Sequence, residues 1–225
     1  MKVTTDACLF GAWVSEEVKA TADLYKSVVD IGAGTGLLSL MLTQALPDCA
    51  IKAIEIDQEA AEQAVQNIRN SPFSHRIEIV HADIRKLELS AKAALIISNP
   101  PFYEDELRSP DPIKNRAHHD EGLLLEELIP LIKSKLQPAG NFFILLPYKR
   151  RAEIKRLLSN WELSIEKEIL VKPSPAKDFF RIMLKGSHAG AMTHTTVLKT
   201  MEITDANGSY MPQFTSLLKD YYLFL

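Results

Sequence analysis

A glycine-rich turn between two apolar segments constrains the fold of this chain more than any other feature. Residues 28–31 read Val-Val-Asp-Ile, Gly32, Gly34 and Gly36 follow at alternate positions, and residues 37–42 are mostly apolar. This pattern predicts a buried strand that passes through a tight turn into a helix, as in nucleotide-binding βα units. Such turns also end strands merely to let a helix pack closely, so the turn alone does not define a ligand.

The spacing of these glycines and the acidic residue ahead of them argue against a dinucleotide. The dinucleotide fingerprint is G-x-G-x-x-G, whereas this turn reads G-x-G-x-G and Asp30 stands just ahead of Gly32. A carboxylate there would repel a pyrophosphate bound at a helix N-terminus. S-adenosylmethionine has no phosphate and carries an ammonium and a sulfonium group. Asp30 therefore favours S-adenosylmethionine as the cofactor.

A second predicted strand, residues 50–57, ends in two acidic side chains. Glu55 lies 19 residues beyond Gly36, close to the spacing expected of a ribose ligand. We expect the Glu55 carboxylate to accept hydrogen bonds from the two ribose hydroxyls of the cofactor. Asp57 either joins it in the site or caps the helix predicted over residues 58–69.

A third predicted strand, residues 77–80, leads to Asp83. We expect the Asp83 carboxylate to accept a hydrogen bond from the adenine amine of the cofactor. The alternative is a helix cap or a turn residue. Because parallel strands bring their carboxyl ends to one edge of the sheet, Asp30, Glu55 and Asp83 should line one cofactor-binding crevice together with Asn99, which follows a fourth strand.

The segment Asn99, Pro100, Pro101 and Phe102 follows the apolar run of residues 93–98. Prolines lack a backbone N–H and fix φ, so the carbonyls of this stiff turn need donors from elsewhere, and an exocyclic amine is such a donor. Asn99 adds an amide oxygen and Phe102 a ring on which a flipped base could stack. In isolation the motif could be an ordinary strand-ending turn with a core Phe. Its place after the glycine turn and the acidic strand ends favours a clamp for a planar, amine-bearing substrate.

The order of the predicted elements indicates the fold class. We expect an α/β fold with a doubly wound, Rossmann-like sheet, mostly parallel, with an antiparallel C-terminal hairpin. The later strands are predicted over residues 141–146, 163–171 and 179–185, and the last two form the hairpin. We expect one domain over residues 1–225, in which residues 186–225 form a C-terminal extension with a short strand near 196–203 and a closing helix. The chain is 46% apolar, enough for a core without disulfides or metal.

Together the motifs D-x-G-x-G-x-G, E-x-D, A-D and N-P-P-F resemble those of class I S-adenosylmethionine-dependent methyltransferases. N-P-P-[FY] resembles the amino-methylating members, which act on adenine or cytosine amines or on a glutamine amide. Residues 1–13 resemble the M-K-V-x-T-D-x-x-L-x-G-A-W opening of the bacterial tRNA(Val) adenine-N(6)-methyltransferases. Residues 116–118, 124–128 and 214–223 also fit that family, so the resemblance covers nearly the whole chain.

The resemblance implies methyl transfer to the adenine beside the anticodon of a valine tRNA. It assigns catalysis to Asn99, Pro100, Pro101 and Phe102. It also implies that the segment before the glycine turn, within residues 1–20, closes over the methionine end of the cofactor. That inference adds three cofactor-binding residues, namely Lys2, Thr5 and Asp6.

Other functions are compatible with parts of the pattern. A protein glutamine N-methyltransferase uses the same N-P-P-[FY] clamp on a side-chain amide, and a different RNA or DNA adenine-N(6)-methyltransferase would share the chemistry. The opening motif and the lack of a separate N-terminal recognition domain argue against the glutamine substrate. A non-catalytic module that kept the fold is disfavoured because both the cofactor residues and the clamp are present.

The net charge of -3 is the main objection to an RNA substrate, since Lys and Arg usually supply much of the affinity for phosphates. A local basic patch could still suffice, although such runs are often only solvated faces. Helical spacing would place Arg151 and Lys155 on one face. The candidate tRNA contacts are Arg108, Lys114, Arg116, Lys149, Arg150, Arg151 and Lys155.

Several functional classes find no support in the sequence. No segment approaches the roughly 20 apolar residues of a membrane span, and the N-terminus lacks a signal-peptide pattern, so we expect a cytoplasmic protein. Cys8 and Cys49 are too few for a disulfide framework, and no His or Cys spacing suggests a metal site, so we expect reduced, buried thiols and no metal. We expect the chain to act as a monomer.

Overall fold

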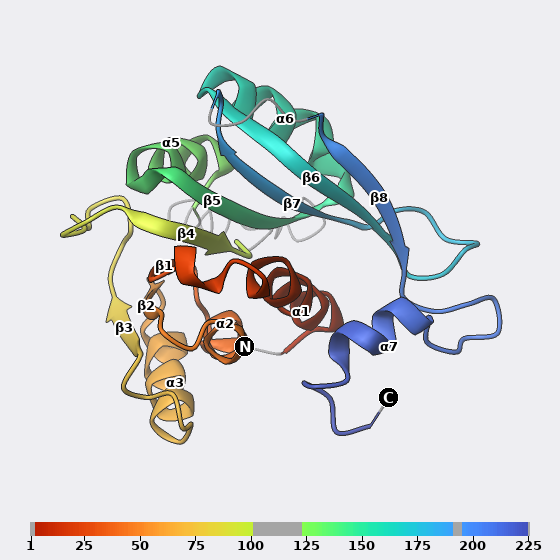
Figure 1. Cartoon of the computed structure of the whole chain (residues 1–225), viewed down its shortest axis with the longest axis horizontal. Helices are drawn as coiled ribbons and strands as arrows, with labels where there is room; N and C mark the ends of the chain where they lie inside the picture. The colour runs from red at the N-terminus through yellow and green to blue at the C-terminus, as the bar shows by residue number, and fades with distance from the viewer. Residues whose placement is uncertain (1–2, 101–122, 191–194, 225) are drawn as a thin grey trace, which may run out of the picture.

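Eight strands form one sheet that runs through the described part of the chain (Figure 1). The computed structural model describes residues 3–100, 123–190 and 195–224. The strand order is β3-β2-β1-β4-β5-β7-β6-β8. The strands are β1 (Ser27–Ile31), β2 (Ala50–Glu55), β3 (Ile77–His81), β4 (Ala93–Ser98), β5 (Leu136–Pro147), β6 (Leu163–Lys172), β7 (Arg181–His188) and β8 (Val197–Glu202). The helices are α1 (Thr5–Lys19), α2 (Leu37–Ala45), α3 (Gln58–Arg69), α5 (Leu125–Lys135), α6 (Arg151–Asn160) and α7 (Pro212–Leu218), with short 3-10 turns η1 (Ala22–Leu24) and η3 (Tyr148–Arg150).

β7 alone runs against its neighbours. It pairs antiparallel with both β5 and β6, whereas the pairs β1-β2, β2-β3, β1-β4, β4-β5 and β6-β8 are parallel. The predicted fold class, a mostly parallel α/β sheet with an antiparallel hairpin, is therefore confirmed. β7 begins two residues later than predicted and runs to His188, so residues 186–188 belong to the sheet and not to the extension.

Helices cover both faces of the sheet, as Figure 1 shows. β4 is buried along its whole length, and its side chains contribute to two hydrophobic clusters. Leu95 and Ile97 join residues of α1, α2 and α7, while Ile96 joins residues of α5 and α6. An apolar run with no polar alternation is what a strand covered on both faces requires.

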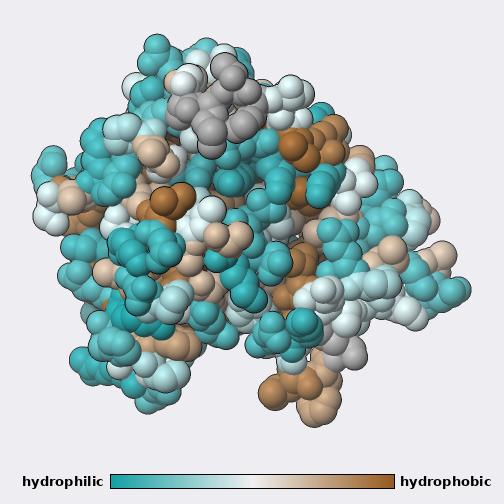
Figure 2. Space-filling model, viewed as in Figure 1, coloured by the Kyte–Doolittle hydropathy of each residue, from teal (hydrophilic) through white to brown (hydrophobic). Residues whose placement is uncertain are grey.

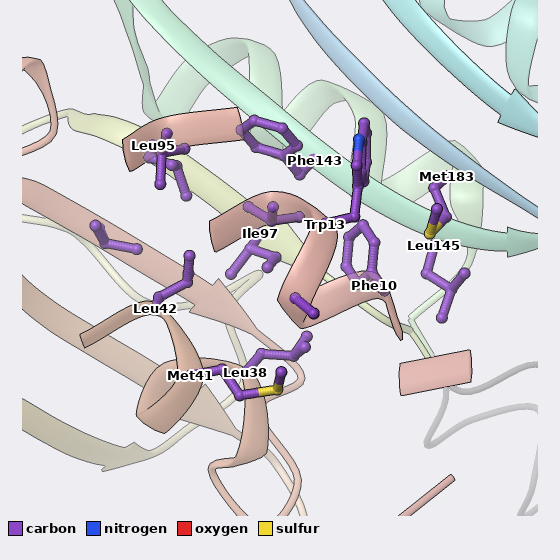
Figure 3. Close-up of a cluster of buried hydrophobic side chains, with 14 of the residues drawn as sticks. Phe10, Trp13, Leu38, Met41, Leu42, Leu95, Ile97, Phe143, Leu145 and Met183 are labelled. Carbon is purple, nitrogen blue, oxygen red and sulfur yellow. The ribbon is translucent and has the colours of Figure 1, made fainter. Parts of the chain in front are cut away.

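α1 packs across the first face and fixes the chain segment that leads to the glycine turn. Trp13 meets Phe143 of β5 edge-on with ring centroids 5.6 Å apart, and Phe10 lies 6.2 Å from Trp13 (Figure 3). Gly11 lets α1 approach α2 closely, because a Cβ at Gly11 would lie 2.5 Å from the Met41 sulfur. The N-terminus of α1 is thereby held over the carboxyl edge of the sheet.

The surface shown in Figure 2 is largely hydrophilic, with separate hydrophobic patches and no continuous apolar band. Among the described residues, no helix is long and apolar enough to cross a membrane. Cys8 and Cys49 are buried and not disulfide-bonded, as predicted.

Candidate active site

A pocket of about 350 Å³ lies at the carboxyl ends of β1, β2 and β4. This is the edge at which parallel α/β sheets bind ligands, and the volume lies within the usual range for small-molecule sites. The structure brings many of the predicted residues together in its lining, namely Asp6, Gly32, Gly34, Glu55, Asp83, Asn99 and Pro100.

The glycine turn after β1 forms part of the pocket wall. Gly32, Gly34 and Gly36 have φ angles of 73°, 57° and 84°, a left-handed conformation that side chains rarely adopt. A Cβ added at Gly32 would meet nothing within 4 Å, so the missing side chain leaves open space at the pocket wall. Gly36 ends the turn as the residue preceding α2 and does not line the pocket.

Two backbone hydrogen bonds anchor the Glu55 side chain at the end of β2. One carboxylate oxygen accepts the Gly34 N–H at 2.7 Å and the other accepts the Asp57 N–H at 2.9 Å. The residue is only 6% exposed and lines the pocket. A carboxylate has about four lone-pair positions, so two remain for hydroxyl donors from a ligand.

Asp30 lies beneath the pocket rather than in its lining. It is fully buried, and its Oδ2 accepts the Ser39 hydroxyl at 2.7 Å while its Oδ1 has no partner. Burial raises the pKa of the Asp30 carboxyl to about 7, and the nearby Glu55 charge acts in the same direction. An unpaired buried oxygen is costly unless a further donor reaches it.

Asp57 adopts the capping alternative. Its carboxylate accepts the Ala60 N–H at 2.8 Å as the N-cap of α3, and Asp57 is absent from the pocket lining. The helix predicted over residues 58–69 has these bounds in the structure. The capping bond explains the position of Asp57 without a ligand.

Asp83, which follows β3, also lines the pocket. Its Oδ1 accepts from the backbone N–H and from Nε of Arg85, both at 2.9 Å, and Arg85 also contacts Glu127 at 3.1 Å. The hydrogen bonds from Arg85 lower the pKa of the Asp83 carboxyl below its ordinary value. Ile84 is buried beside it and adds an apolar surface to the lining.

The N-terminal segment closes one side of the pocket through an ion pair that the sequence does not reveal. Asp6 of α1 accepts from Nε of Arg181 at 2.7 Å, and both residues line the pocket. Although burial opposes it, hydrogen bonds from Thr4 and Arg181 lower the pKa of Asp6. Thr5 begins α1 and is absent from the lining, and Lys2 lies outside the described residues.

Asn99 and Pro100 follow β4 directly into the pocket lining. The strand end is fixed beneath them, because the Ser98 hydroxyl donates to the Ile31 carbonyl at 2.8 Å. Pro101 and Phe102 lie outside the described residues. The described part of the N-P-P-F segment therefore shares one pocket with Glu55 and the glycine turn.

The basic run after β5 is largely paired with carboxylates. Arg151 and Lys155 lie on one face of α6, as predicted, and both bind Glu168, at 2.6 Å and 2.8 Å. Arg150 binds Glu153 at 2.6 Å. These contacts neutralise part of the patch proposed for RNA. Lys149 is exposed, and Arg108, Lys114 and Arg116 lie outside the described residues.

Solved structures similar to this fold include methyltransferases. A predicted O-methyltransferase from Agrobacterium tumefaciens is 19% identical and has a TM-score of 0.69, covering 95% of both chains. A glycopeptide N-methyltransferase complexed with sinefungin is 11% identical and has a TM-score of 0.56, covering 80% of this chain and 87% of the other. Residues 15–162 match the family described as Methyltransferase small domain. The fold and the pocket at its carboxyl edge define a class I methyltransferase.

Curated relatives narrow the class. A tRNA1(Val) (adenine(37)-N6)-methyltransferase from Dyadobacter fermentans is 39% identical over 99% of this chain and 91% of its own length. A relative of the same name from Parabacteroides distasonis is 34% identical with the same coverage. The chain belongs to the tRNA1(Val) (adenine(37)-N6)-methyltransferase family. Among the described residues, no group of His, Cys, Asp or Glu is placed to hold a metal ion.

Proposed function

We propose that this chain transfers a methyl group from S-adenosylmethionine to the exocyclic N6 amine of adenine 37 in tRNA1(Val), the substrate named for its relatives. The observation that carries the proposal is the joint pocket: Asn99 and Pro100 share one lining with Glu55 and the glycine turn. A methyl acceptor clamp and a cofactor cradle are needed within one site for direct transfer. The cytoplasm, which holds bacterial tRNA, is the compartment this function requires.

The pocket lining fits S-adenosylmethionine. The open space at Gly32 gives an uncharged backbone wall, and Glu55 keeps free lone pairs at the pocket surface. The unpartnered Oδ1 of Asp30 lies beneath the same wall, where a cationic donor would remove the cost of its burial. Acidic groups of this kind suit a cofactor with two positive groups and no phosphate.

Four of the lining residues, and Asp30 beneath them, have a defined task in this proposal. Glu55 binds the ribose hydroxyls, Asp83 accepts from the adenine amine, and Ile84 packs against the adenine ring. Asp30 attracts the positive methionine end through the turn, and Asp6 holds the N-terminus of α1 over that end by its bond to Arg181. These residues bind and orient the cofactor, and none of them needs to act as a base.

The acceptor amine is held by the end of β4. S-adenosylmethionine, when bound, supplies the methyl group. The Asn99 side-chain oxygen and the Pro100 carbonyl accept hydrogen bonds from the adenine amine and turn its lone pair toward the cofactor pocket. In this proposal Pro101 stiffens the turn and Phe102 stacks on the flipped base, as their motif implies.

The named relatives favour the tRNA substrate over the protein glutamine alternative, because the resemblance spans the full chain at 30% identity or more. The two differ in acceptor chemistry as well. A glutamine amide needs the same two acceptors but offers no aromatic ring to stack on Phe102.

The test is methyl transfer from labelled S-adenosylmethionine to tRNA that lacks this modification, followed by mass spectrometry of the nucleosides. We expect N(6)-methyladenosine in one valine tRNA. Isothermal titration with S-adenosylmethionine, run on the same preparation, measures cofactor binding separately. Cofactor binding without any labelled tRNA would refute the substrate, whereas no cofactor binding would refute the pocket assignment.

A further inference from the structure

Aromatic and basic side chains gather just past the carboxyl ends of β5 and β6, next to the amino end of the antiparallel strand β7. Phe179 and Phe180 precede β7, and Tyr148 follows β5. Lys172 ends β6. All four side chains are partly exposed. We call Tyr148, Lys172, Phe179 and Phe180 the hairpin surface, and no role in the proposed reaction has used them.

The sheet fixes the backbone of the hairpin surface. Pro147 and Val171 both pair with Arg181, which aligns the three strand ends in one row. In the next row, the Tyr148 N–H donates to the Phe180 carbonyl at 3.0 Å and the Phe180 N–H donates to the Val171 carbonyl at 3.0 Å. The aromatic side chains therefore extend from a rigid base.

The rings and the cations of this surface lie against one another. The Tyr148 and Phe179 centroids are 5.2 Å apart, and the Lys172 ammonium lies 4.8 Å from the Phe179 centroid. On the other side, the Arg181 guanidinium lies 5.2 Å from the Phe180 centroid. Arrays of aromatic rings and cations are typical of surfaces that bind single-stranded nucleic acid, since bases stack on the rings and phosphates meet the cations.

The hairpin surface adjoins the methyl-transfer pocket. Arg181 belongs to the pocket lining, and its guanidinium contacts the ring of Phe180. Phe180 therefore lies next to the pocket, while Phe179 and Tyr148 pack against the other hydrophobic cluster. β5 lies between β4 and β7. With neighbouring strands about 4.8 Å apart, β7 and β6 lie roughly 10 to 14 Å from β4, which leads into Asn99. Stacked bases rise by about 3.4 Å each, so three or four nucleotides span this length.

The charge distribution favours this surface over the basic run of α6. Glu168 forms ion pairs with both Arg151 and Lys155. Lys172, in contrast, forms no ion pair among the described residues. Lys177 is exposed in the loop between β6 and β7 and forms none there either. Both ammonium groups can therefore meet phosphates without breaking a salt bridge.

We propose that the hairpin surface binds the single-stranded RNA nucleotides next to the target adenine, with a base stacked on Phe179 and phosphates on Lys172 and Lys177. This inference rests on the proposed function, because it assumes an RNA loop as substrate. Stacking on a rigid ring holds the RNA loop beside the pocket, while Asn99 and Pro100 alone position the flipped adenine. The surface sets affinity for the RNA and leaves the chemical step unchanged.

The experiment uses an unmodified transcript of tRNA1(Val) and the full chain. Phe179→Leu keeps apolar volume and removes the ring, and we expect its KM for the transcript to rise about tenfold with kcat and cofactor affinity unchanged. Phe179→Tyr should restore the KM, and Lys172→Ala should reduce the slope of log affinity against log salt by about one phosphate contact. Trp161→Leu is the matched control, because Trp161 is an exposed aromatic at the opposite end of β6.

Direct binding of the same transcript, measured by fluorescence anisotropy, separates this inference from the proposed function. Weaker binding by Phe179→Leu, with wild-type binding by Trp161→Leu and an unchanged melting temperature, supports the surface even where no methylation is detected. Equal affinities of wild type and Phe179→Leu, or an unaltered salt slope in Lys172→Ala, would overturn it even where the wild type methylates the transcript.

Discussion

Each half of the sheet contains one buried glutamate, and the two glutamates have different partners. Glu55 in the half formed by β1 to β4 is 6% exposed, and Glu168 in the half formed by β5 to β8 is 1% exposed. Glu55 accepts two backbone N–H groups and borders a pocket. Glu168 instead binds Arg151 and Lys155, which fastens α6 to β6.

The comparison shows that burial of a carboxylate does not by itself indicate a binding site. Neutral backbone donors stabilise Glu55 and leave its negative charge available to a ligand. Two cationic side chains neutralise the charge of Glu168, so this residue contributes to the stability of the fold and not to ligand binding. Backbone N–H donors therefore mark the glutamate suited to ligand binding, and cationic side chains mark the structural one. Variants of the two residues should separate effects on ligand affinity from effects on stability.

The largest effect is expected at the end of β4. Asn99→Ala removes an acceptor for the substrate amine, so kcat should fall roughly 100- to 1,000-fold, as for the loss of one preorganised polar group. The affinity for S-adenosylmethionine should fall far less than kcat, since Asn99 borders the cofactor pocket but makes its main proposed contact with the acceptor amine. Single-turnover methylation and calorimetry measure the two quantities. Equal losses in both would contradict the assignment.

Asp30 extends the comparison to a buried carboxylate without any positive partner. Its folded pKa of about 7 lies above the ordinary value of 3.8, so between these values the unfolded chain releases a proton that the folded chain retains. The free energy of unfolding should therefore fall as pH rises from 4 to 7, by at most about 1.4 kcal/mol per pH unit. Asp30→Asn should remove this dependence, which urea titrations at several pH values would measure. Parallel pH profiles for both proteins would refute the raised pKa.

Glu55→Gln tests the pocket half directly. Replacing the charged acceptor should weaken S-adenosylmethionine binding by about 10- to 100-fold, the range for hydrogen bonds to a charged group. Glu168→Gln is the matched control, because it makes the same change at a buried glutamate that borders no cofactor. Calorimetric affinities that fall equally in both variants would show that stability, and not ligand contact, controls binding.

The same control variant makes its own prediction in the other half of the sheet. Glu168→Gln leaves Arg151 and Lys155 without their shared partner, so the free energy of unfolding should drop by about 2 kcal/mol. The two cations are partly exposed, which limits the loss. Urea denaturation measures it, and an unchanged midpoint would mean that Glu168 does not fasten α6.

The two halves also differ in how far the sequence predicts them. The glycine turn and the N-P-P-F segment follow from local patterns, because each comes directly after a mostly apolar strand. Glu55 and Asp83 likewise lie at or just past a strand end. The pairing of Glu168 with Arg151 joins residues 17 positions apart on different elements, and the pair Asp6 and Arg181 spans 175 positions. The sequence alone shows the basic run of residues 149–156 but not its acidic partners, because packing decides which charges meet. The placement of β7 between β5 and β6 likewise depends on tertiary pairing.

Asp57 gives the smallest effect and decides between two roles that the sequence leaves open. Asp57→Ala removes the hydrogen bond to the Ala60 N–H at the start of α3 and should cost about 1 kcal/mol of unfolding free energy. Asp57→Ser keeps a capping oxygen without the charge, so it should recover most of that stability. Both variants should bind S-adenosylmethionine like the wild type, because the carboxylate lies outside the pocket lining. If Asp57 instead bound the ribose, both variants would bind the cofactor more weakly whatever their melting temperatures. The cofactor site would then have to include the start of α3.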